Sequence, residues 1–168
     1  CVAAGSDIPV FFTSVSDPVA AGIISDMEHP DKNATGTSNA IPVEDIFALM
    51  EKLTPDVKTV GIVYNTSEDN AVSTVESAKA YLEENGYTVE ESVVTNSSEV
   101  QQACQNLFPN VDAVFIPNSA MVQSAMALVA DIAAEYKLPT YASSAATVET
   151  GAMATVAMSD KEIGAATA

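Results

Sequence analysis

The sequence predicts an α/β fold built on a parallel β-sheet. Short apolar runs alternate with longer segments whose apolar residues recur at helical spacing, a pattern typical of strands joined by right-handed helical crossovers. Residues 59–65 are apolar almost throughout, as expected of a strand whose sheet is covered by helices on both faces. A polar cluster at residues 66–70 follows this run. In open α/β sheets, ligands bind beyond the carboxyl ends of the strands, so this cluster is the first candidate for a site.

The first elements are a strand, a short helix and a connection. We expect a strand at residues 8–13, with Pro9 tolerated near its start. A short helical stretch at residues 19–24 follows, and the turn-rich residues 29–38 connect it to the next unit.

Two helices flank the strand at residues 59–65. Pro42 suits the first position of the earlier helix. Proline lacks an N–H group, and an N–H at this position would have no partner within the helix. Gly86 suits the left-handed cap that ends the later helix. Their apolar stripes are Val43, Ile46, Phe47, Met50 and Leu53 in the earlier helix and Val72, Val75, Ala78 and Leu82 in the later one.

The alternation continues to the end of the chain. Residues 88–94 form a more polar strand, expected near a sheet edge, and Asn96 with Glu99 has the spacing of a capping box for the next helix. One long helix is expected through residues 122–136, and Ser159 with Glu162 caps a final helix. The remaining strands are predicted at residues 112–117, 138–142 and 152–157.

Composition excludes several classes of function. The 168 residues carry a net charge of −17, and all six basic residues are lysines. Such an acidic chain without arginine is repelled by phosphate backbones and anionic membrane surfaces, so we expect no nucleic-acid partner. No apolar run approaches the roughly 20 residues that cross a bilayer. The hydrophobic fraction of 48% is too high for a disordered chain and suffices for a core.

The residues that commonly carry catalysis or bind metals are few. His29 is the one histidine and falls in a turn, which disfavours a Ser-His-Asp triad. The two cysteines suggest neither a disulfide framework nor a metal site, and no glycine-rich phosphate loop follows a strand. We expect no catalytic residue, no metal and no cofactor. Cys104 lies on an apolar stripe and is predicted to be a buried thiol, whereas Cys1 is either a lipidated first residue or, the favoured interpretation, an internal residue at a truncated end.

Small polar residues stand at the carboxyl end of each of four predicted strands. Loops are often polar, but four such ends on one sheet edge favour a small-molecule site. Tyr64 and Tyr141 could stack on a ligand, although tyrosines in apolar strands are more often part of the core. The polar residues are Ser14 and Ser16, Asn65 and Thr66, Asn118 and Ser119, and Ser143 and Ser144.

Two alternatives are weaker, namely a phosphoacceptor receiver domain and paired glutamates that act as acid and base. A phosphoacceptor receiver domain has the same alternation of strands and helices. It needs acidic residues after its early strands and a lysine after a late one, whereas here Asp112 begins its strand and serines follow residue 142. The pairs Glu83-Glu84 and Glu90-Glu91 are expected to be solvated charge.

Four stretches occur in a characteristic order and spacing: residues 8–22 (IPVFFTSVSDPVAAG), 33–38 (NATGTS), 60–70 (VGIVYNTSEDN) and 151–155 (GAMAT). Together they resemble ABC-transporter substrate-binding proteins of the tryptophan/tyrosine-binding type. The resemblance implies a periplasmic-binding-protein fold of type I, in which two lobes of parallel sheet clamp a ligand in the cleft between them. On this pattern residues 1–33 are the last strand and helix of the first lobe, residues 34–150 form the complete second lobe, and residues 151–168 return to an incomplete first lobe.

The resemblance also implies a function without enzymatic activity. The full-length protein would bind a small organic ligand, with an aromatic or other apolar amino acid among the candidates, and deliver it to ABC permease subunits. It would lie outside the cytoplasm, either lipid-anchored at the cell surface or periplasmic. A ligand-sensing or interaction module without transport is the alternative. The 168-residue chain itself, with most of a lobe missing, would self-associate through its exposed first strand.

The ligand contacts are assigned on the matching motifs. Where the family has an Asp-Asn pair this chain has Ser119-Ala120, a serine replaces an acidic residue near Ser144, and the Asp-Tyr usual near residues 159–160 is displaced. Because the chain has no arginine, hydroxyls and backbone N–H groups at helix starts would meet a ligand carboxylate. The expected contacts are Ser14, Ser16, Asp17, Asn65, Thr66, Ser67, Glu68, Asn70, Asn118, Ser119, Ser143 and Ser144.

Overall fold

The computed structural model describes residues 8–19, 21–158 and 160–167. The chain divides into two compact units, one made of Cys1–Ile41 with Met158–Ala168 and the other of Pro42–Ala157. The two units meet at residues 41/42 and 157/158, whereas the lobe boundaries were expected at residues 33/34 and 150/151. The difference arises because residues 34–38 pair with the first strand, while residues 154–155 pair within the sheet of the second unit.

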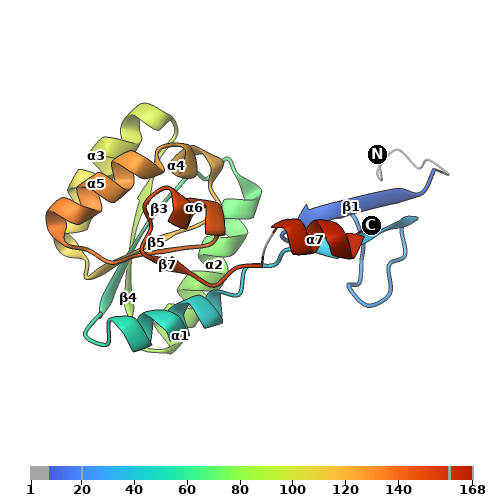
Figure 1. The fold of residues 1–168 in the computed structure, drawn as a ribbon, viewed down its shortest axis with the longest axis horizontal. Helices are drawn as coiled ribbons and strands as arrows, with labels where there is room; N and C mark the ends of the chain where they lie inside the picture. The colour runs from blue at the N-terminus through green and yellow to red at the C-terminus, as the bar shows by residue number, and fades with distance from the viewer. Residues whose placement is uncertain (1–7, 20, 159, 168) are drawn as a thin grey trace. The chain divides into compact units, whose positions relative to one another are not determined.

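The second unit is built on a five-stranded parallel sheet (Figure 1). Its order is β4-β3-β5-β6-β7, with each neighbouring pair parallel. The predicted parallel α/β architecture is therefore confirmed, and β4 lies at an edge as its polar sequence indicated. The strands are β3 (Thr59–Tyr64), β4 (Thr88–Val93), β5 (Ala113–Ile116), β6 (Thr140–Ala142) and β7 (Ala154–Thr155).

Helices cover both faces of this sheet (Figure 1). On one face Phe115 of β5 packs against Phe47, with ring centroids 5.2 Å apart, and Phe47 stacks on Tyr81. On the other face Val114 and Ile116 belong to an apolar cluster with residues of α3 and α5. Burial on both faces explains why these strands are apolar without alternation. The helices are α1 (Val43–Leu53), α2 (Asp69–Glu84), α3 (Val100–Leu107), α4 (Ala120–Ser124), α5 (Met126–Tyr136) and α6 (Ala145–Glu149).

The helix predicted through residues 122–136 is two helices. α4 ends at Ser124, and Ala125 leaves helical geometry with φ −101° and ψ 13°. The Ser124 hydroxyl donates to the carbonyl of Met121 at 2.7 Å, a local bond that competes with the helical ladder. The sequence prediction missed this break because the apolar spacing continues across it.

The helix boundaries depend on local caps. Gly86 has φ 82° and its N–H donates to Glu83 at 3.1 Å, which confirms the predicted end of α2. Lys137 supplies a left-handed cap to α5 with φ 58°. Glu99 reaches back, but its carboxylate accepts from the N–H of Thr95 at 2.8 Å instead of that of Asn96. A 3-10 turn at Ser97–Glu99 therefore precedes α3.

The described residues of the first unit form a two-stranded parallel sheet and one helix. β1 (Val10–Val15) pairs with β2 (Ala34–Ser38), and α7 (Asp160–Thr167) contacts both strands. β2 corrects the expectation that these residues are only a connection. The helix predicted near residues 19–24 is wrong for the described residues, which form turns closed by bonds such as Ile23 N–H to Pro18 O at 2.9 Å. The predicted cap Ser159 lies outside the described residues.

None of the helices in the described part of the chain has both the length and the apolar character needed to cross a membrane.

Candidate functional site

The polar residues that follow β3, β5 and β6 lie at the same edge of the sheet in the second unit. The three strands are neighbours and run parallel, so their carboxyl ends coincide. The N–H of Ser143 donates to the carbonyl of Ile116 at 3.0 Å and carries the pairing of β5 and β6 to their ends. This edge therefore brings together Asn65, Asn118 and Ser143, as predicted for three of the four strand ends. The fourth end, with Ser14 and Ser16, belongs to β1 in the separate two-stranded sheet, which corrects the expectation of a single sheet edge.

Asn65 is buried directly after β3, with 5% of its surface exposed. Its side-chain oxygen accepts from the N–H of Ser67 at 2.8 Å, which shapes the turn. Its amide nitrogen lies 3.6 Å from the sulfur of Met121, a weak acceptor. Asn65 thus keeps donor capacity that a stronger acceptor could use. The neighbouring Thr66 and Ser67 are exposed.

Both carboxylate oxygens of Glu68 accept hydrogen bonds from backbone N–H groups at the start of α4. One oxygen accepts from the N–H of Ala120 at 2.7 Å and the other from the N–H of Met121 at 3.2 Å. The next N–H, that of Val122, lies 3.5 Å from the hydroxyl of Ser119, the N-cap residue. The first N–H groups of a helix have no partner within it. Glu68 satisfies two of them from the loop after β3, and Ser119 satisfies the third from the N-cap of α4 itself.

A second set of bonds joins α2 to the loop after β5. The Asn70 side chain donates to the carbonyl of Asn118 at 2.8 Å. The Thr74 hydroxyl lies 2.9 Å from the side-chain oxygen of Asn118. The sequence analysis did not propose Thr74 as a site residue. Its position one helical turn after Asn70 is the one sequence signal that could have indicated it. Met121, which contacts Asn65, had no signal in the sequence.

The residues after β6 differ in how their hydroxyls are satisfied. Ser144 caps α6, and its oxygen accepts from the N–H of Thr147 at 3.3 Å. The hydroxyl of Ser143 is buried and has no hydrogen-bond partner among the residues that the structure describes. Buried polar groups are nearly always paired, so Ser143 is a group for which a partner is expected.

The three remaining predicted contacts belong to the first unit. Ser14 is exposed and has φ 56°, near the irregularity where the register of β1 and β2 shifts. The carbonyl of Ser16 accepts from the Ser38 hydroxyl at 3.2 Å. Asp17 is exposed, and its carboxylate accepts from the N–H of Val19 at 3.1 Å.

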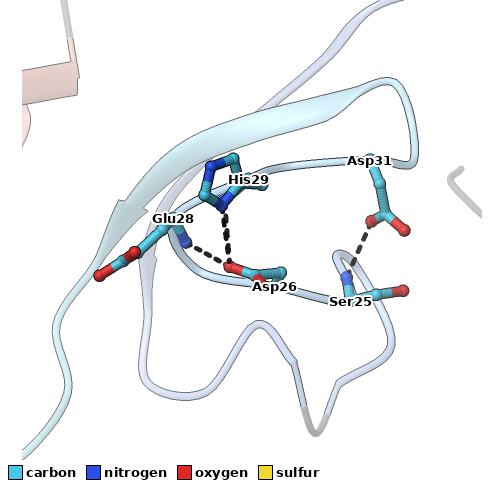
Figure 2. A network of polar contacts seen from close by, with 5 residues as sticks. All are labelled: Ser25, Asp26, Glu28, His29 and Asp31. Atoms are coloured by element: carbon cyan, nitrogen blue, oxygen red, sulfur yellow. Dashed lines mark hydrogen bonds and ion pairs between the residues drawn. The ribbon is translucent and has the colours of Figure 1, made fainter.

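The loop around His29 is organised by side-chain bonds to its own backbone (Figure 2). Asp26 accepts from the N–H groups of Glu28 at 2.7 Å and His29 at 3.1 Å, and the imidazole lies 3.8 Å from the same carboxylate. Asp31 accepts from the N–H of Ser25 at 2.9 Å, a bond that lowers the pKa of Asp31. These hydrogen bonds explain the conformation of the loop and assign its acidic side chains a structural role. In the described part of the chain no group of three or more His, Cys, Asp or Glu side chains could hold a metal ion.

The side chains assigned to the core are buried. Tyr141 donates to or accepts from Thr54 at 2.9 Å inside the second unit. The Tyr64 hydroxyl donates to Glu91 at 3.0 Å, and Glu91 also pairs with Lys79. Glu91 is therefore part of a network, which corrects its assignment to solvated charge. Cys104 is fully buried, and burial raises the pKa of its thiol to about 12, as expected of an inert core residue.

Comparison with known proteins assigns this fold to one class of protein. The family of ABC transporter substrate binding proteins matches residues 1–168, and the chain belongs to that family. The family consists of substrate-binding proteins, in agreement with the expectation of no enzymatic activity. The predicted family is confirmed.

Individual relatives are similar over nearly the whole chain. A tyrosine-binding protein of Clostridioides difficile is 37% identical over 161 residues, which are 96% of this chain and 47% of the relative. A solved ABC domain in complex with L-Trp from Streptococcus pneumonia is 35% identical with a TM-score of 0.87, covering 96% of this chain and 55% of that one. The ligand-free, open structure of a substrate binding protein with adhesive properties from Clostridium difficile is 39% identical, with a TM-score of 0.82, 94% of this chain and 54% of that one.

The chain spans about half the length of the curated relatives it matches. Over that half, its α/β fold with parallel sheets matches the periplasmic-binding-protein structures, which confirms the predicted fold class.

Proposed function

We propose that the full-length protein is the solute-binding component of an ABC importer and binds an aromatic amino acid. The observation that carries this proposal is the edge where β3, β5 and β6 end. There Asn65 has an amide donor opposite only a weak acceptor, and Ser143 has a buried hydroxyl without a partner among the described residues. Groups of this kind fix the orientation of a small ligand in a mostly apolar site.

The ligands of two relatives support the proposed ligand class. One is named a tyrosine-binding protein, and another was solved with L-Trp. Both ligands combine an apolar ring with an ammonium and a carboxylate. This chain matches these proteins at 37% and 35% identity, which supports a ligand of the same chemical class.

The charges of the chain favour recognition through neutral groups. There is no arginine, and the lysines of the second unit are Lys52, Lys58, Lys79 and Lys137. None of these lysines lies in the loops directly after β3, β5 or β6. A ligand carboxylate at this edge would therefore accept hydrogen bonds from amides and hydroxyls, here Asn65 and Ser143, with Thr66, Ser67 and Ser144 nearby.

A role in import implies the partners of the full-length protein and its location in the cell. We assign ABC permease subunits as partners and a location outside the cytoplasm, cell-surface or periplasmic, because import begins with capture of the solute there. Family membership supports both assignments.

Calorimetric titration of the full-length protein tests the proposal. L-tyrosine, L-tryptophan and L-phenylalanine are compared with L-leucine, and L-lysine serves as a control with a charged side chain. We expect the aromatic amino acids to bind at least about tenfold more tightly than the others, or roughly 1.4 kcal/mol. Equal affinity for all five, or no binding, would overturn the assignment of the ligand class.

A further inference from the structure

We propose that Glu68 is a positioning residue, which holds the start of α4 against the loop after β3 and leaves contact with the ligand to its neighbours. The inference rests on the proposed function for its role in binding. It concerns how Asn65 and Met121 are kept together at the carboxyl edge of the sheet.

The geometry of the carboxylate carries the inference. Its two oxygens accept from two consecutive backbone N–H groups, those of Ala120 at 2.7 Å and Met121 at 3.2 Å. Hydrogen bonds from N–H groups to a carboxylate are among the stronger ones in proteins. A ligand ammonium that drew the Glu68 carboxylate away from α4 would leave both N–H groups at the helix start without this partner. Such a loss is costly for groups that no other residue of α4 can satisfy.

Other hydrogen bonds also join the segment after β3, which includes α2, to the segment after β5. Asn70 donates to the carbonyl of Asn118, the Thr74 hydroxyl contacts the side chain of Asn118, and the amide of Asn65 lies against Met121. All these bonds run from the segment after β3 to the segment after β5. Glu68 alone among these residues binds the backbone N–H groups of Ala120 and Met121, so it sets where the backbone of Met121 lies relative to Asn65.

The test compares Glu68→Gln and Glu68→Ala in the full-length protein with Glu83→Ala, an exposed glutamate of α2, as the matched control. Amide hydrogen exchange at Ala120 and Met121 is measured without ligand. Affinity is then measured for L-tyrosine and for 3-(4-hydroxyphenyl)propionate, which lacks the α-amino group.

A positioning role predicts a particular pattern. In Glu68→Ala the two amides exchange at least about tenfold faster, and both ligands lose affinity by the same factor, on the order of tenfold. Glu68→Gln keeps one acceptor oxygen and recovers part of both effects. Glu83→Ala changes neither quantity.

Two results would overturn the inference. One is a loss of affinity confined to L-tyrosine, because it would show that Glu68 meets the α-ammonium group. The other is unchanged exchange at Ala120 and Met121. If Glu68→Ala does not fold, the exchange rates and ligand profile of Glu68→Gln decide. If the unmodified protein binds neither ligand, the proposed function fails, whereas the exchange measurement still tests Glu68.

Discussion

Gly36 lies so close to Phe12 across the β1–β2 pair that a Cβ atom at Gly36 would be 1.9 Å from the carbonyl oxygen of Phe12. The atom in the way is backbone, which cannot turn aside as a side chain can. Pairing of the two strands in this register therefore requires glycine at this position.

Gly36→Ala is expected to destabilise the β1–β2 pair by about 1–3 kcal/mol, as overpacking does in a well-packed region. Hydrogen exchange at the amides of β1 in the full-length protein measures the effect. Gly164→Ala is the control, since a Cβ atom there meets nothing within 4 Å and the residue lies in α7. Equal exchange in the two variants would show that the strands can shift to admit a methyl group.

Asn65→Ala in the full-length protein is expected to weaken binding of the aromatic amino acid by about 1–3 kcal/mol, as for the loss of a buried hydrogen-bonding group. The reason is the amide donor of Asn65, which faces only the sulfur of Met121 at 3.6 Å. Calorimetry measures the affinity, with the exposed Asn110→Ala as control. An unchanged affinity would remove Asn65 from the site.

The pKa of Tyr64 is raised, first by burial and then by its hydrogen bond to Glu91. The contribution of this group to stability is therefore fully present below the ordinary tyrosine pKa of about 10 and is lost as the pH rises through the raised value. Glu91→Gln should lower the pKa of Tyr64 without restoring its ordinary value, because burial persists. Ultraviolet titration measures it, and Tyr64→Phe identifies the signal. A pKa that does not fall in Glu91→Gln would contradict the role of Glu91.

Cys104 is expected to resist alkylation until the second unit unfolds. Burial raises the pKa of its thiol to about 12, so the reactive thiolate is scarce near neutral pH, and the side chain is fully covered. Iodoacetamide labelling at increasing urea, followed by peptide mass spectrometry, separates Cys104 from Cys1. Labelling of Cys104 before the unfolding transition would mean that the core around α3 opens locally.

The 168-residue chain is expected to self-associate through β1. Phe11 and Ile8 expose 73% and 72% of their surfaces. Among the described residues β1 pairs only with β2, so exposed apolar side chains lie at a strand with one edge open to pairing. Light scattering over a concentration series measures the assembly. Phe11→Ser should reduce it, whereas Val93→Ser, at the exposed edge strand β4, should not. A monomer at all concentrations would refute this expectation.

Much of the second unit could be predicted from its sequence, because the relevant forces are local. The uninterrupted apolar run of β3 indicated a sheet covered on both faces, and Gly86 indicated the end of α2. The polar residues of β4 indicated an edge. In each case the pattern reflects which faces of one element meet the core, and that is visible in neighbouring residues.

Local patterns were insufficient where a partner lies far along the chain. Residues 34–38 have few apolar side chains and resemble a loop, yet they form β2 because β1 offers hydrogen bonds. The end of α4 at Ser124 is equally hidden, since the apolar spacing continues into α5 and a hydroxyl bond sets the break.

The amino-acid pattern was enough to predict the class of fold, the family, and the strand ends at which polar residues gather. How those polar atoms are used depends on which strands lie side by side in the folded chain. Once β5 lies beside β3, Glu68 reaches the N–H groups of Ala120 and Met121, while the Ser143 hydroxyl at the end of β6 is left without a partner among the described residues. Hydrogen bonding depends on distances within a few ångströms, and for residues some fifty positions apart those distances are set by the order of strands in the sheet.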